Sequence, residues 1–194
     1  MNLANKITLL RVILIPIFLF VYLVQPLPEI PNLWLAIFIF TVAAITDAID
    51  GYVARKYQLV SNFGKLMDPL ADKLLVCSAL VAYLATGSLS GQFAIWAVII
   101  MISREFYVSG LRMLALEQNK VLAASRGGKT KTGLQIALII VVLLPIQMLS
   151  FDWLFTLHNW IVLVLLAITT IVSVWSVVDY TLRNKDIFTK NTGG

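Results

Sequence analysis

Two short stretches, DAIDGYVAR at residues 47–55 and GKLMDPLAD at residues 64–72, stand out in a chain that is otherwise mostly apolar. The first contains two aspartates three residues apart, and the second contains two aspartates four residues apart. Residues at these spacings lie on the same face of an α-helix. Two helices can therefore direct four carboxylates to one place. The four residues are Asp47, Asp50, Asp68 and Asp72.

Four ionised carboxylates that lie close together repel one another, so this arrangement predicts that cations lie between them. Carboxylate oxygens favour hard divalent ions such as Mg²⁺, Mn²⁺ or Ca²⁺ over zinc. The chain has one histidine and one cysteine, which excludes a His–Cys metal cluster and a disulfide framework. We therefore expect two divalent ions at the aspartates, Mg²⁺ in the first place and Mn²⁺ as the alternative.

The composition indicates a membrane protein rather than a soluble domain. Of the 194 residues, 60% are hydrophobic and 13% are charged, and the mean hydropathy is +0.90. The net charge of +5 comes from basic residues close to the apolar stretches. This placement fits anionic lipid headgroups and phosphate substrates, and it does not indicate nucleic acid binding.

Six apolar stretches are long enough to cross a membrane. We expect an all-α polytopic membrane protein with six transmembrane helices, forming a single domain over residues 1–194. With the N-terminus in the cytosol, all 15 Lys and Arg residues lie at cytosolic ends. The positive-inside rule thus predicts a multi-pass protein of the cell membrane with both termini cytosolic. The expected spans are residues 7–25, 33–55, 67–86, 92–116, 132–150 and 156–182.

This topology locates the aspartates near the cytosolic face. If the second span enters from outside at Leu33, a rise of 1.5 Å per residue puts Asp47 about 21 Å and Asp50 about 26 Å into the membrane. A charge in the bilayer is costly, so four carboxylates must face a polar, metal-filled cavity rather than lipid. We expect the active site at the cytosolic end of the helix bundle.

Small residues beside the aspartates leave room for a ligand. Gly51 and Ala54 lie on the same helix as Asp50, and Gly64 precedes the second pair. Arg55 offers a planar fork of donors that suits phosphate oxygens. Each small residue alone is equally explained by helix packing. The combined spacing favours a metal site that binds a diphosphate.

The complete pattern of both stretches resembles the signature of the CDP-alcohol phosphatidyltransferase family, at all eight signature positions. Chain length and the six expected spans also resemble that family, so the resemblance covers nearly the whole chain. Members join an alcohol to a phosphatidyl group from CDP-diacylglycerol, or transfer a phosphoalcohol from a CDP-alcohol to a lipid, and release CMP.

The resemblance implies roles for individual residues. Asp47, Asp50 and Asp68 would hold one metal ion, and Asp47, Asp68 and Asp72 the second. Asp72 would also be the general base for the acceptor hydroxyl, in a direct displacement. The resemblance further implies a homodimer. The residues implied to bind CDP-diacylglycerol are Gly51, Ala54, Arg55, Gly64, Ser61 and, in a motif near the N-terminus, Asn5 and Thr8. Asn5 as a simple helix N-cap is the alternative for that motif.

The second substrate is indicated by a different set of residues. Arg104, Arg112, Lys129 and Lys131 are candidates for binding an acceptor phosphate, although basic residues at a cytosolic face also contact anionic lipids. The strings around them, SRE at 103–105, SGLR at 109–112 and GKTKT at 128–132, resemble the bacterial phosphatidylglycerophosphate synthase branch. That branch uses sn-glycerol 3-phosphate and makes phosphatidylglycerophosphate in phospholipid biosynthesis.

Other functions remain open at this point. Inositol phosphate, phosphatidylglycerol or serine could be the acceptor within the same family. A membrane prenyltransferase also uses two Asp pairs, but on helices far apart in sequence. A cation transporter with an acidic site is the alternative outside enzymes, although such sites lie near the membrane midplane between internal repeats.

Overall fold

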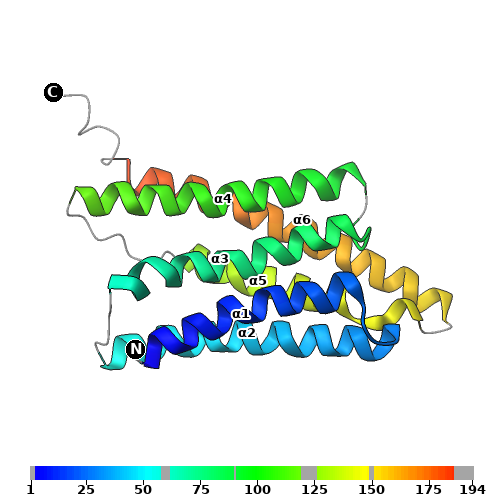
Figure 1. Ribbon diagram of the computed structural model, residues 1–194. Coiled ribbons are helices and arrows are strands. Elements are labelled where there is room, and N and C mark those ends of the chain that lie inside the picture. Colours follow the sequence, from blue (N-terminus) through cyan, green and yellow to red (C-terminus); the bar gives the residue numbers. More distant parts are fainter. Residues whose placement is uncertain (1–2, 58–61, 90, 119–125, 149–150, 186–194) are drawn as a thin grey trace. The chain divides into compact units, whose positions relative to one another are not determined.

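The structure is a computed structural model that describes residues 3–57, 62–89, 91–118, 126–148 and 151–185 (Figure 1). Within these ranges, the side chains of residues 3–8, 47–57, 62–72, 116–117, 126–127, 129 and 147–148 lie outside the description. The described residues form six α-helices and one short 3₁₀ helix. They are α1 (Leu3–Val24), α2 (Glu29–Tyr57), α3 (Asn62–Ala85), α4 (Gln92–Glu117), α5 (Arg126–Leu143), η1 (Pro145–Met148) and α6 (Asp152–Arg183).

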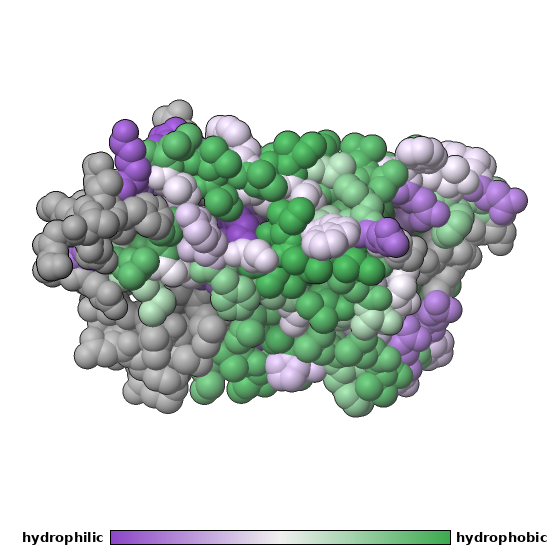
Figure 2. Space-filling view, turned by 90° about the horizontal axis from the view of Figure 1, so that it is seen from above, coloured by the Kyte–Doolittle hydropathy of each residue, from purple (hydrophilic) through white to green (hydrophobic). Residues whose placement is uncertain are grey.

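The all-α expectation is confirmed, and each expected span has its own α-helix. Among the described residues, three stretches are long and apolar enough to cross a membrane: Glu29–Thr46, Gln92–Ala115 and Asp152–Arg183. Shorter apolar helices cover Leu9–Val24, Lys73–Ala85 and Thr130–Leu143. Hydrophobic side chains dominate the coloured part of the face shown in Figure 2. These features are those of a membrane protein with several candidate transmembrane helices.

The helices fall into two compact units. The first contains α1, α2, α3, the end of α5, η1 and the start of α6 (Met1–Leu89 and Ile139–Asn159). The second contains α4, most of α5 and the rest of α6 (Ser90–Leu138 and Trp160–Gly194). The aspartate-bearing helices α2 and α3 thus belong to the first unit, and the candidate acceptor residues belong to the second.

Aromatic rings form the centre of the first unit, where α1 packs against α2 and α3. Phe18 lies 5.9 Å from Tyr22 and 5.6 Å from Phe40 between ring centroids. Tyr22 meets Tyr83 of α3 edge to face, at 5.2 Å. All four rings are buried. Such ring pairs add to the packing energy that holds helices together inside a membrane, where lipid removes most of the hydrophobic driving force.

The hydroxyl groups of this aromatic cluster are also paired. The Tyr22 hydroxyl lies 2.9 Å from the Thr86 hydroxyl and 2.7 Å from the Ser88 hydroxyl. The Tyr83 hydroxyl donates to the carbonyl oxygen of Ile139 on α5, at 3.0 Å. Each buried phenol therefore keeps a partner, as buried polar groups require. These bonds join the end of α3 and the end of α5 to the cluster.

The turn between α1 and α2 shows how the chain reverses direction. Gln25 has a left-handed backbone (φ 52°) and its N–H donates to the carbonyl of Val21 at 3.2 Å, which ends α1. Pro26 follows and cannot continue the helix. The buried side chain of Asn32 then donates from α2 back to the same Val21 carbonyl, at 2.7 Å.

The end of the fifth helix differs from the expectation. We expected a span over residues 132–150, but α5 ends at Leu143 and η1 begins at Pro145. Proline lacks the N–H that the helix needs and disfavours helical backbone in the residue before it. The apolar run that continues past this point concealed the break. The next helix, α6, is tied to α5 where the His158 imidazole meets the carbonyl of Val141, at 2.9 Å.

Candidate functional site

Both aspartate pairs lie on α-helical backbone. Asp47 and Asp50 are part of α2, and Asp68 and Asp72 are part of α3. These two helices contact each other within the first unit. The helical backbone that the spacing requires is therefore present. The four side chains themselves lie outside the described residues, so their convergence on one point stays a prediction.

Most of the residues expected to bind CDP-diacylglycerol also lie on helices, and their side chains are likewise not described. Asn5 and Thr8 lie on α1, Gly51, Ala54 and Arg55 on α2, and Gly64 on α3, with side chains outside the described part. Ser61 lies outside the described residues altogether. Their expected roles stay predictions.

The second unit holds a buried cluster of charged residues on α4 and α5. Lys131 of α5 forms an ion pair and hydrogen bond with the Glu105 carboxylate of α4. The same carboxylate lies 3.5 Å from an Nη atom of Arg104. Arg104, Glu105 and Lys131 are 8%, 7% and 3% exposed. Buried charges are costly unless they are paired, so one carboxylate neutralises part of two cations here.

The other Nη atom of Arg104 donates to the hydroxyl of Ser176 on α6, at 2.8 Å. One turn further along α6, Tyr180 meets Arg112: the Arg112 Nε donates to the phenol oxygen at 3.3 Å, and the guanidinium carbon lies 5.9 Å from the ring centroid. Two of the four expected acceptor residues, Arg104 and Lys131, are thus brought together through Glu105. Arg112 joins α6 at a neighbouring point, and the Lys129 side chain lies outside the described residues.

Sequence reasoning assigned no role to Glu105, Ser176 or Tyr180. A signal for the last two is visible in α6, where polar residues recur at spacings of four, three and four. These residues are Thr169, Ser173, Ser176 and Tyr180, and all four are buried. A polar stripe at helical spacing in an apolar helix marks the face that packs against other helices. Thr169 and Ser173 donate to carbonyls of their own helix, whereas Ser176 accepts from Arg104.

The cluster has the chemistry of an anion site. Two buried cations share one carboxylate, and guanidinium and ammonium groups both bind phosphate by charge-assisted hydrogen bonds. The Nε of Arg104 is buried and has no hydrogen-bond partner in the part of the chain that the structure describes. Donor capacity therefore remains at this arginine for an incoming oxyanion.

Comparison with known proteins agrees with this chemistry. The family model described as CDP-alcohol phosphatidyltransferase matches residues 1–178. Three relatives named CDP-diacylglycerol–glycerol-3-phosphate 3-phosphatidyltransferase are similar over most of their length. The Bacillus subtilis protein is 44% identical over 78% of this chain and 83% of its own. The Rickettsia bellii protein is 42% identical over 73% and 75%, and the Haemophilus influenzae protein 35% identical over 92% and 91%.

The family match covers the helices that carry both aspartate pairs and the helices that carry the buried ion cluster. The three relatives cover most of this chain at identities of 35% to 44%. The chain belongs to the CDP-alcohol phosphatidyltransferase family.

Proposed function

We propose that this protein transfers the phosphatidyl group of CDP-diacylglycerol to sn-glycerol 3-phosphate, which gives phosphatidylglycerophosphate and CMP. The family membership supports the reaction type, and the names of the relatives support the acceptor. The observation that carries the acceptor assignment in this chain is the buried pairing of Arg104 and Lys131 with Glu105. A phosphorylated alcohol needs such cations, whereas an uncharged alcohol does not.

The donor set on α2 and α3 fits two hard divalent ions, Mg²⁺ in the first place and Mn²⁺ as the alternative. It offers only carboxylates, on two helices that contact each other. Asp47, Asp50, Asp68 and Asp72 would hold the ions. When bound, these ions would neutralise the diphosphate and stabilise the leaving CMP. Among the described residues no other group of His, Cys, Asp or Glu has the composition of a metal site.

The protein's own residues would carry the remaining steps. Asp72 would accept the proton of the attacking hydroxyl. Arg55, near the end of α2, would bind diphosphate oxygens, and Gly51 and Gly64 would leave space for the nucleotide. Positioning and charge stabilisation are what phosphoryl transfer requires of a protein, and a direct displacement follows.

Six spans with both termini in the cytosol complete the proposal. Each expected span has an α-helix, and the 15 Lys and Arg residues all fall at the ends assigned to the cytosol. The glycerol phosphate and the CMP are polar, so a site at this end exchanges them with the cytosol. A homodimer, implied by the family, is part of the proposal.

The test is CMP release by the purified protein with CDP-diacylglycerol and Mg²⁺, one acceptor at a time. We expect release with glycerol 3-phosphate and little with inositol phosphate, serine or phosphatidylglycerol. Release with one of those acceptors alone would keep the reaction and reassign the substrate. No release with any acceptor would contradict the proposal and favour a cation transporter, which vesicle uptake of divalent ions would then detect.

A further inference from the structure

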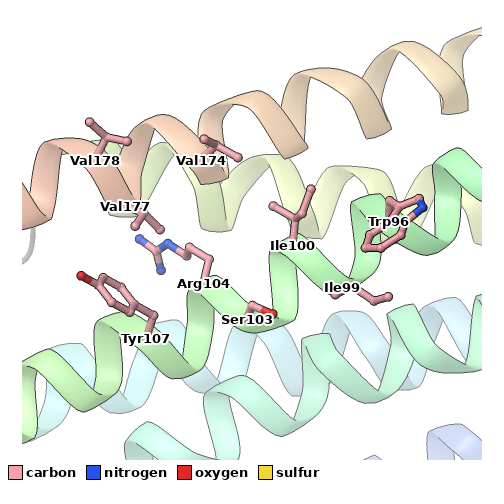
Figure 3. A pocket seen from close by; sticks show the side chains of 9 residues that line it. All are labelled: Trp96, Ile99, Ile100, Ser103, Arg104, Tyr107, Val174, Val177 and Val178. Atoms are coloured by element: carbon pink, nitrogen blue, oxygen red, sulfur yellow. The ribbon is translucent and has the colours of Figure 1, made fainter.

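An open groove of about 360 Å³ lies between α4 and α6 in the second unit (Figure 3). Its walls come mainly from apolar side chains, among them Ile99 and Ile100 of α4 and Val174 and Val177 of α6. Trp96, at one end of the labelled residues in Figure 3, is 64% exposed. Both helices are long and apolar enough to cross a membrane. Exposed apolar walls on such helices are suited to lipid, so the groove can open to the hydrocarbon of the bilayer.

The groove also has a charged lining residue, Arg104, whose guanidinium lies beside Val177 in Figure 3. The Arg104 side chain is only 9% exposed. Its Nη atoms meet Glu105 and Ser176, while its Nε has no partner in the described part of the chain. An unpaired buried donor on a charged group is costly. This cost indicates that the Nε–H of Arg104 donates a hydrogen bond to a ligand during turnover.

Further polar groups surround this charged end. Ser103 precedes Arg104 and also lines the groove. Tyr107 lies one turn further on, and its hydroxyl is 3.1 Å from the Thr181 hydroxyl of α6. The groove is therefore polar around Arg104 and Tyr107 and apolar towards Trp96. With 1.5 Å per residue, Arg104 and Trp96 are separated by about 12 Å along α4, a distance that an acyl chain can cover.

An apolar channel with a cation at one end matches a phospholipid: an acyl chain beside the valines and isoleucines, and a phosphate at the arginine. Under the proposed function, the product is a lipid that still carries the acceptor's phosphate. This product could therefore place its phosphate at Arg104 and one of its acyl chains in the groove at the same time. That molecule has to leave sideways into the bilayer, because its acyl chains cannot enter water.

We propose that the α4–α6 groove is a lipid subsite, in which an acyl chain of the phosphorylated lipid product lies along the groove while Arg104 holds its phosphate. The identity of this lipid rests on the proposed function. The preference for an anionic lipid rests on Arg104 alone. Boundary lipid without headgroup preference, or a second copy of the chain on this face, are the other occupants that an experiment has to distinguish.

Tryptophan quenching by brominated phospholipids tests the subsite. A variant that keeps only Trp96, with the other four tryptophans changed to Phe, is placed in phosphatidylcholine vesicles. A small fraction of the lipid is replaced by dibrominated phosphatidic acid, a phosphomonoester lipid, or by dibrominated phosphatidylcholine with the same chains. We expect quenching of Trp96 to show that the groove binds the brominated phosphatidic acid about tenfold more strongly than the brominated phosphatidylcholine. One added charge-assisted hydrogen bond supplies about this factor.

A variant that keeps only Trp175 is the matched control. Trp175 lies on α6, is 56% exposed and does not line the groove. It should be quenched equally by both brominated lipids. Two further changes are made in the Trp96-only protein: Arg104→Gln removes the charge, and Val177→Phe fills the groove. Each should abolish the preference for phosphatidic acid. If Arg104→Gln does not fold, Val177→Phe still tests the groove without altering a charge.

Equal quenching of Trp96 by both lipids would overturn the proposal and indicate ordinary boundary lipid. No quenching of Trp96 by either lipid would also overturn it and indicate that another chain covers this face. Acceptor-driven CMP release by the wild-type protein is measured in parallel. CMP release together with equal quenching of Trp96 by both lipids overturns the lipid subsite alone. A lipid preference without release overturns the proposed reaction and leaves a binding site for anionic phospholipid.

Discussion

The two units join their helices by opposite chemistry. In the first, the rings of Phe18, Tyr22 and Tyr83 hold α1 against α3, and every phenol in the cluster has a hydrogen-bond partner. In the second, Glu105 and Lys131 join α4 to α5 through charges. A satisfied aromatic cluster gains nothing from a ligand, whereas two cations that share one carboxylate keep uncompensated positive charge that can bind a phosphate as well. The comparison fits a packing role for the aromatic cluster of the first unit and the acceptor binding that we propose for the second.

The largest expected effect comes from Asp72, the proposed catalytic aspartate, which lies on α3 of the first unit. Asp72→Asn removes the proposed base, so CMP release should fall about 10²- to 10⁴-fold with every acceptor. The fall should appear in kcat, and the melting temperature in detergent should change little. A variant that loses activity only with glycerol 3-phosphate would contradict the division of roles between the units.

Glu105→Gln, in the second unit, should have the second-largest effect, on both stability and the KM for glycerol 3-phosphate. It leaves the Lys131 ammonium buried without its carboxylate, which costs about 3 kcal/mol of stability. The KM for glycerol 3-phosphate should rise by at least tenfold, while the KM for CDP-diacylglycerol stays near the wild-type value. Steady-state kinetics with each substrate varied in turn provide the measurement.

Asp179→Asn is the matched control for that variant. It removes a carboxylate that pairs with Arg183 on the same unit, at 2.7 Å, where the arginine side chain is 70% exposed. An exposed pair of this kind contributes under about 1 kcal/mol. Equal rises in acceptor KM for both variants would show that Glu105 has no particular role at the acceptor site.

Phe18→Ala should lower stability without changing substrate preference. It opens a cavity among rings that are fully buried, at a cost of about 2–3 kcal/mol, below the usual range because lipid already solvates the unfolded helices. The melting temperature should fall, and both KM values measured well below it should be unchanged. A rise in the acceptor KM alone would contradict the expectation that the aromatic cluster of the first unit has no role in acceptor binding.

Tyr180→Phe should give the smallest effect. It removes the hydroxyl that accepts from Arg112 but keeps the ring under the guanidinium, so the loss is about 0.5–1.5 kcal/mol. The acceptor KM should rise by less than about tenfold. Tyr180→Leu, which also removes the ring, should raise the KM further.

The sequence predicted each helix because apolar runs of this length admit few other structures in a membrane. It also predicted the break after α1, where Gln25 precedes a proline. The predicted end of α5 was wrong because Pro145 lies in a mostly apolar stretch that continues to Leu149. The cross-helix partners of Arg104 and Lys131 were not predictable in the same way. Helices that are hydrophobic all round give little periodicity, so the sequence does not reveal which face meets which neighbour.

The aspartate site shows a different limit. Its residue types and spacing predicted the family, and the comparisons bear this out. The helical backbone of α2 and α3 agrees with the spacing. The convergence of the four carboxylates depends on how the two helices are rotated about their axes, which neither spacing nor apolar pattern determines.

The pairing of Arg104 with Ser176 has a consequence for biogenesis. Arg104 enters the membrane on α4 with Glu105 as its direct neighbour, so opposite charges arrive together and lower the cost of inserting either alone, about 2.5–3.5 kcal/mol each. Lys131 arrives with α5, and Ser176 only with α6, which is made last. The proposed anion site is therefore completed late in synthesis. A ribosome paused before α6 would hold a chain whose Arg104 still lacks its hydroxyl partner.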